Sequence, residues 1–173
     1  MNNSNPVEFD DLQGLVRFGY GKLTDTSFLL LTIAEVNAAK QWLAIAPISN
    51  AAHTDQQGTA LQIAFTAQGL CALGLDAIIH DFSDEFIYGM AGDESRSRRL
   101  GDVEANAPGH WDWGAKPNNM PHVLLMLYAK SGGIEAWKKQ VTGNNFSKAF
   151  KILKTLPTLD IGQIEPFGFA DGI

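Results

Sequence analysis

Residues 28–33 read Phe-Leu-Leu-Leu-Thr-Ile, a short and continuous apolar run. A run of this length without alternation is typical of a strand that is buried on both faces. Residues 122–129, His-Val-Leu-Leu-Met-Leu-Tyr-Ala, have the same character. Residues 59–65 instead alternate, with Leu61 and Ile63 on the same side, as expected of a strand with one apolar face. The sequence therefore predicts three strands.

Segments with helical spacing of apolar residues lie between and after these strands. Apolar residues recur every three or four positions over residues 36–46, which predicts an amphipathic helix. Thr66 is a suitable N-cap for a short helix over residues 67–73. After the third strand, the spacing predicts a helix over 134–141 and continues as a helix over 146–153. On this interpretation Pro157 ends that helix, and residues 158–164 form a last strand or an extended segment.

Residues 76–121 show little periodicity and are rich in glycine. A connection of this length inside a compact domain is uncommon and is usually functional or poorly ordered. The order strand, helix, strand, short helix, long loop, strand, helix indicates an α+β fold of ferredoxin-like type, with an antiparallel sheet and helices on one face. We expect residues 1–173 to form one such domain.

Composition and charge limit the possible functions. With 45% hydrophobic and 18% charged residues, the chain is too apolar to be disordered. No segment approaches the ~20 apolar residues of a membrane span. The net charge of −6 argues against nucleic acid or an anionic membrane as the main partner. The polar residues 1–6 lack a signal-peptide pattern, so we expect a cytoplasmic protein.

Most residues with reactive side chains have an ordinary structural interpretation. The histidines, His53, His80, His110 and His122, lack the spacing of metal ligands, so no metal site is predicted. We expect His122 to be a structural histidine. Cys71, the only cysteine, falls within a predicted helix and should act as a small core residue.

Two segments of the long loop have unusual composition. Residues 93–99, Asp-Glu-Ser-Arg-Ser-Arg-Arg, carry both charges and are expected to form a solvated loop, although an arginine there could hold a carboxylate or phosphate. Residues 111–114, Trp-Asp-Trp-Gly, are rich in aromatic side chains for a loop. We expect both tryptophan rings to close the edge of the core.

The last segment, residues 166–172, reads Pro-Phe-Gly-Phe-Ala-Asp-Gly. Gly168 and Gly172 permit a tight backbone, and Phe167 and Phe169 would exclude water from Asp171. An apolar environment raises the pKa of a carboxylate and prepares it for proton transfer. The alternative is an ordinary Asp-Gly turn without function.

Several motifs in this order resemble the dye-decolorising heme peroxidases. Gly168-Phe169-Ala170-Asp171-Gly172 matches the GxxDG signature of that family. Further residues resemble family segments in the same order: 11–14 with 19–21, 65–70 with 73–75, and, in the long loop, Phe86, Gly89-Met90, Arg98, Leu100-Gly101-Asp102, Pro108 and Trp111-Asp112-Trp113-Gly114. The resemblance implies a protein of dimeric α+β barrel type, in which heme lies between two ferredoxin-like halves. It also implies that Asp171 is the distal acid–base residue and that Gly168, Phe169, Ala170 and Gly172 border the heme.

In that family the axial histidine and the distal arginine come from the second half, after GxxDG. None of the four histidines here matches the axial position. The resemblance therefore implies that this chain alone lacks peroxidase activity and does not hold heme by itself. A C-terminal half, in the same or another chain, would be its partner, with hydrogen peroxide and an organic reductant as substrates. The alternative is a non-catalytic ferredoxin-like module that acts by association, as a homo-oligomer.

Overall fold

The computed structural model describes residues 7–52, 58–158 and 167–168. Four strands form one sheet in the order β2-β3-β1-β4, and every neighbouring pair is antiparallel. These strands are β1 (Asp25–Ile33), β2 (Thr59–Phe65), β3 (Val123–Ala129) and β4 (Phe150–Pro157). This is the strand order of a ferredoxin-like α+β fold, which confirms the predicted fold class.

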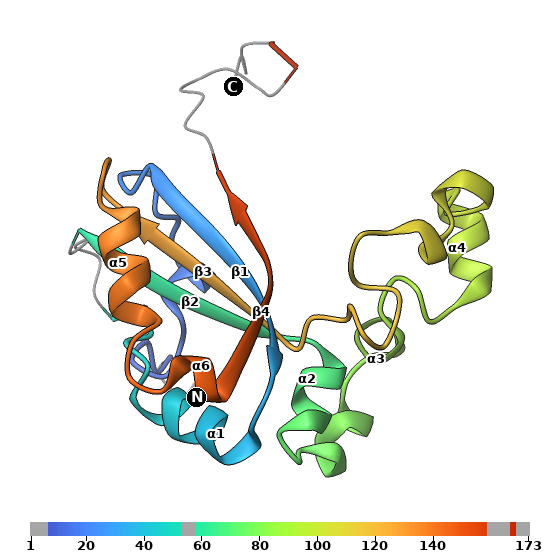
Figure 1. The fold of residues 1–173 in the computed structure, drawn as a ribbon, viewed down its shortest axis with the longest axis horizontal. Helices are drawn as coiled ribbons and strands as arrows, with labels where there is room; N and C mark the ends of the chain where they lie inside the picture. Colours follow the sequence, from blue (N-terminus) through green and yellow to red (C-terminus); the bar gives the residue numbers. More distant parts are fainter. Residues whose placement is uncertain (1–6, 53–57, 159–166, 169–173) are drawn as a thin grey trace, which may run out of the picture.

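Three helices cover one face of the sheet (Figure 1): α1 (Val36–Ile45), α5 (Ile134–Val141) and α6 (Phe146–Ala149). Side chains of β3 alternate strictly between buried and half-buried, and its buried set packs beneath these helices. The rings of Trp42 and Phe146 meet edge to face, with centroids 5.5 Å apart. The prediction of helices on one face of an antiparallel sheet is therefore confirmed.

The opposite face of the sheet is covered in part by the N-terminal segment. This segment includes the short 3-10 helix η1 (Gly14–Val16) and the buried Tyr20 and Leu23. The Gln13 side chain pairs with the Ile63 backbone through two hydrogen bonds, of 2.9 and 2.7 Å. Gln62 is 1% exposed, and its side-chain oxygen accepts from the Leu15 N–H while its amide donates to the Ser49 carbonyl. The buried Gln62 amide therefore has the hydrogen-bond partners that burial requires.

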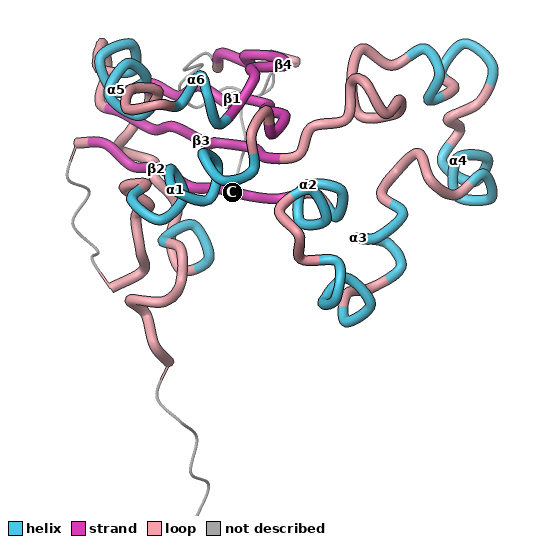
Figure 2. Tube along the Cα trace, turned by 60° about the horizontal axis from the view of Figure 1, so that its bottom comes forward, coloured by secondary structure: helices cyan, strands magenta, loops and turns pink. Residues whose placement is uncertain are grey.

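Residues 76–121, which we call the arm, lie between β2 and β3 in the sequence. In space, the arm extends beyond one end of the sheet (Figures 1 and 2). The short helix α2 (Ala67–Ala72) precedes the arm. The arm contains the helices α3 (Asp84–Tyr88) and α4 (Glu94–Leu100) and the 3-10 helices η2 (Asp76–Asp81), η3 (Glu104–Asn106) and η4 (Pro108–His110). It is therefore a series of short helical turns. The prediction that residues 93–99 form a loop was wrong, because Asp93 caps α4 by accepting from the Ser95 N–H.

The prediction for residues 146–157 was also wrong. The helix predicted over residues 146–153 stops at Ala149, and Phe150 begins β4. Pro157 is the last residue of this strand and does not terminate a helix. The lysines Lys151 and Lys154 are typical of an edge strand, where charge discourages pairing with other chains. Residues 159–164, expected to be extended, lie outside the described residues.

Candidate functional site

The GxxDG segment is only partly described. Gly168 has a φ of +83°, a left-handed conformation that favours glycine, as expected of this position. Phe167 is 88% exposed. The predicted site residues Phe169, Ala170, Asp171 and Gly172 lie outside the described residues.

His122 has the structural role that was predicted. Its Nδ1 accepts the Ile33 N–H at 3.1 Å, and its backbone carbonyl accepts the Thr66 N–H. Burial lowers the pKa of His122. The ring therefore serves as a neutral acceptor at the junction of β1, β3 and α2.

The other candidates also have local roles. His80 and His110 are exposed, and the His110 ring contacts the Ala105 carbonyl at 3.2 Å. Cys71 is half-buried, and burial, with a smaller contribution from Asp76, raises the pKa of its thiol. A thiol with a raised pKa is a poor nucleophile. His53 lies outside the described residues.

A cavity of about 690 Å³ lies where the arm meets the end of the sheet. Its first wall is the end of β2 and the start of α2, with Phe65, Thr66 and Gln68. Its second wall is α3 and the turn that follows, from Glu85 to Ala91. Its third wall is formed by residues 111–114 with Met120 and Pro121. Segments far apart in the sequence thus enclose one space, as is typical of ligand sites.

Hydrogen bonds fix the third wall. The Asn119 side chain accepts from the Lys116 N–H at 2.8 Å and donates to the Asp112 carbonyl at 3.1 Å. The Asn119 carbonyl accepts the Gly114 N–H at 2.9 Å. The Trp111 indole N–H donates to the Asn106 carbonyl, which sets the plane of its ring. These hydrogen bonds therefore hold the third wall in place.

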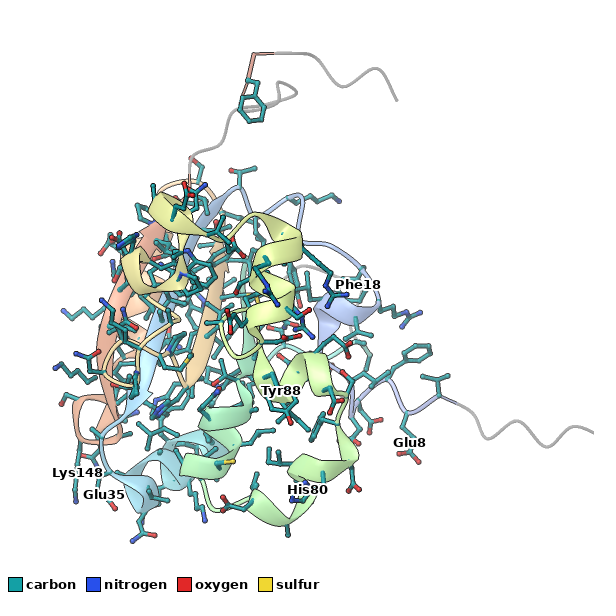
Figure 3. The ribbon with its side chains drawn as sticks, turned by 90° about the vertical axis from the view of Figure 1, so that its right-hand side faces the viewer. Glu8, Phe18, Glu35, His80, Tyr88 and Lys148 are labelled. Atoms are coloured by element: carbon teal, nitrogen blue, oxygen red, sulfur yellow. The ribbon has the colours of Figure 1, made fainter. Side chains whose placement is uncertain are left out.

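The second wall is tied to α4 in a similar way. Arg96 donates to the Gly89 carbonyl at 2.8 Å and lies 3.9 Å from the Glu85 carboxylate. The Thr66 hydroxyl joins the first wall to the third, since it donates to the Pro121 carbonyl and accepts the Gly69 N–H. Figure 3, which views the molecule from the side of the arm, labels Tyr88 on this face.

The cavity carries two carboxylates, and its described lining has no lysine, arginine or histidine. The Glu85 backbone N–H and the Ser83 hydroxyl hold the pKa of Glu85 below its usual value. A hydrogen bond from Lys154, at 2.7 Å, holds the pKa of Asp112 below its usual value. Both groups are therefore ionised at neutral pH.

The sequence did not indicate this cavity as a unit. Trp111 and Trp113 were expected to close the edge of the core, and they instead line the cavity, with Trp113 37% exposed. Tyr88 and Met120 were not indicated by the sequence, and Met90 was indicated only as part of the family resemblance. The available signal was the density of glycine and aromatic residues in the arm, together with its unusual length.

The same geometry bears on metal and heme binding. In the described residues, no group of three histidine, cysteine or acidic side chains could hold a metal ion. Heme requires an axial ligand in a closed pocket. None of the three described histidines borders the cavity.

Known structures share this fold. No family model and no curated relative matches the sequence. A fungal DyP-type peroxidase from Auricularia auricula-judae superposes with a TM-score of 0.69 at 22% identity, over 98% of this chain and 38% of that one. A dye-decolorizing peroxidase in complex with 2,6-dimethoxyphenol gives a TM-score of 0.72 at 20% identity, over 97% of this chain and 39% of that one.

A second structure of a decolorizing peroxidase from Auricularia auricula-judae gives 0.72 at 23% identity, over 96% of this chain and 37% of that one. The chain therefore has the fold of the N-terminal ferredoxin-like domain of DyP-type peroxidases, and it spans less than two fifths of the chains that it matches. Among the residues that the structure describes, no helix is both long enough and apolar enough to cross a bilayer.

Proposed function

We propose that this chain is the N-terminal part of a heme-dependent DyP-type peroxidase and that Asp171 is its distal acid–base residue. The observation that supports this most is the fold, which matches these peroxidases over 96–98% of the chain. The GxxDG motif at residues 168–172 and the ordered segments before it give independent support.

In this proposal Asp171 accepts a proton from one oxygen of hydrogen peroxide and returns it to the other, so that the O–O bond breaks heterolytically. A carboxylate in an apolar pocket is suited to both transfers. The heme supplies the redox chemistry when bound. In this proposal it is bordered by the residues around Asp171, namely Gly168, Phe169, Ala170 and Gly172. An organic reductant completes the cycle. We also propose a cytoplasmic location, with which a single cysteine that can form no internal disulfide is compatible.

A C-terminal half, in the same or another chain, supplies the axial histidine and covers the open face of the sheet. Leu124, Met126 and Tyr128 alternate with the core residues of β3 and are only half-buried there. Phe28 of β1 lies beside them, opposite Met126 in the register. These apolar side chains support a partner on that face.

A heme titration tests the proposal. The chain alone should leave the broad Soret band of free heme unshifted, and the chain combined with the C-terminal half of a DyP-type peroxidase should give a sharp, shifted band that saturates at one heme per pair. A sharp, shifted band with the chain alone would contradict the assignment of the axial ligand. An unshifted band with a pair that co-purifies would contradict the proposed cofactor.

The same apolar face favours a second candidate, a non-catalytic module that forms a symmetric dimer through it. Sedimentation of the wild-type chain should then show a dimer, and Met126→Lys should yield a monomer. Ile45→Lys, which changes an exposed residue of α1 behind the sheet, is the matched control and should leave the dimer intact. A stable monomer at high concentration would rule this candidate out.

A further inference from the structure

We propose that the cavity between the end of β2, α3 and residues 111–121 binds an organic cation that carries a flat aromatic group. This inference is independent of the proposed peroxidase function. It rests on three properties of the cavity: aromatic walls, a described lining with two carboxylates and no basic side chain, and walls that internal hydrogen bonds hold in place.

Aromatic rings reach the cavity from all three walls. Phe65 comes from β2, Phe86 and Tyr88 from α3, and Trp111 and Trp113 from the third wall. The face of an aromatic ring attracts a cation, and tryptophan attracts it most strongly. Met90 and Met120 add flexible, polarisable side chains that adapt to a ligand's shape. A cavity of about 690 Å³ lies within the range of small-molecule sites.

The charges of the cavity select a cation over an anion. Its only ionised lining groups, within the described residues, are the carboxylates of Glu85 and Asp112. Both side chains are more than 70% exposed, so they stand at the rim where a ligand enters. An anionic aromatic would meet these charges, and the described lining itself contributes no cation, because the nearest bases, Arg96 and Lys154, lie outside it and face the two carboxylates.

Each rim carboxylate has a basic neighbour, and the two pairs differ in distance. Lys154 lies 2.7 Å from Asp112, whereas Arg96 is 3.9 Å from Glu85 and also holds the Gly89 carbonyl. A bound cation therefore competes chiefly with Lys154, whose side chain is 40% exposed and free to move into solvent. Removal of Lys154 should strengthen cation binding, a result that a purely apolar cavity would not give.

The walls need little rearrangement to accept a ligand. Asn119 closes the third wall with three hydrogen bonds, and the Thr66 hydroxyl joins that wall to the first. The ring plane of Trp111 is set by its bond to the Asn106 carbonyl. Binding to such a preformed site loses less conformational entropy than binding to a mobile one.

The test compares three probes of similar size on the full chain: phenyltrimethylammonium, benzyl alcohol and benzenesulfonate. Binding is followed by titration calorimetry and by NMR shifts of the Trp111 and Trp113 indoles. Phenyltrimethylammonium should bind about tenfold more tightly than benzyl alcohol, and benzenesulfonate should bind least. Equal affinities for the cation and the alcohol, or tightest binding of the sulfonate, would overturn the proposal.

Variants then locate the site. Asp112→Asn and Trp113→Leu should each weaken phenyltrimethylammonium binding several-fold, and Lys154→Met should strengthen it. Glu94→Gln, the loss of an exposed carboxylate on α4 outside the cavity, is the matched control and should change nothing. Circular dichroism verifies that each variant is folded. If Asp112→Asn and Lys154→Met, both folded, leave the affinity unchanged, the cation does not bind at this rim.

Discussion

Replacing Gly69 by alanine should destabilise the protein strongly, because α2 lies directly against the backbone of the β2–β3 junction. An added Cβ would meet the His122 carbonyl oxygen far inside van der Waals contact and would lie 2.7 Å from the carbonyl carbon. The obstacle is backbone, so it cannot rotate away as a side chain could. Either α2 or the start of β3 must therefore move.

The magnitude follows from what that movement breaks. Overpacking of a tight site costs about 1–3 kcal/mol. Displacement of α2 also weakens two hydrogen bonds, Thr66 N–H to His122 at 3.1 Å and the Thr66 hydroxyl to Pro121 at 2.8 Å, each worth about 1 kcal/mol. We expect a loss of about 3–5 kcal/mol in the free energy of unfolding, or a fall in Tm of about 6–20 °C for a chain of this size.

Urea unfolding followed by circular dichroism measures this loss. Gly109→Ala is the matched control, because a Cβ there would meet no atom within 4 Å, and its stability should change by less than about 1 kcal/mol. If Gly69→Ala is as stable as Gly109→Ala, α2 does not pack against His122 as described.

Two further predictions concern the same junction. Burial lowers the pKa of His122, so between its lowered pKa and the ordinary value of 6.5 the unfolded chain binds more protons than the folded one. The stability from neutral His122 is complete above about pH 6.5 and decreases as the pH falls. His122→Asn offers the Ile33 N–H an acceptor that does not titrate. This variant should therefore lose less free energy of unfolding than the wild type between pH 8 and pH 5, as measured by urea unfolding. Equal losses in the two proteins would contradict the role of the His122 ring. Thr66→Val should lower the free energy of unfolding by about 1–2 kcal/mol, through loss of the α2 cap and of the bond to Pro121. An unchanged urea midpoint for Thr66→Val would show that this hydroxyl does not join the walls.

The central strands and their helices could be predicted because the local pattern is clear there. The apolar runs of β1 and β3 form the two central strands of the sheet, and Thr66 caps α2 as its residue type suggests. The expectation of burial on both faces was wrong for β3, because its alternate side chains are only half-buried. At β4 the local pattern misled. Phe146 and Phe150 have helical spacing, and their rings do meet, with centroids 5.3 Å apart, but across the boundary between α6 and β4. Residues 150–157 form a strand because they pair with β1, and such long-range pairing cannot be predicted from the local sequence.

The cavity could not be predicted because its walls are separated in the sequence and are joined by side-chain bonds to backbone. Asn119 and Arg96 order these walls, yet neither belongs to a recognisable motif. For the acid–base candidate, the sequence indicates the residue and the structure does not describe it. Asp171 follows from the GxxDG motif alone, and its surroundings depend on residues outside the described part of the chain.

The proposed role of Asp171 can be tested by the rate at which the assembled protein, this chain with a C-terminal half and bound heme, consumes peroxide. Asp171→Asn should lower this rate by at least about a hundredfold while the Soret band remains, because an amide cannot transfer the proton. Asp160→Asn, the same change elsewhere in the terminal segment, should leave the rate unaltered. An Asp171→Asn protein that binds heme and consumes peroxide at the wild-type rate would contradict the account.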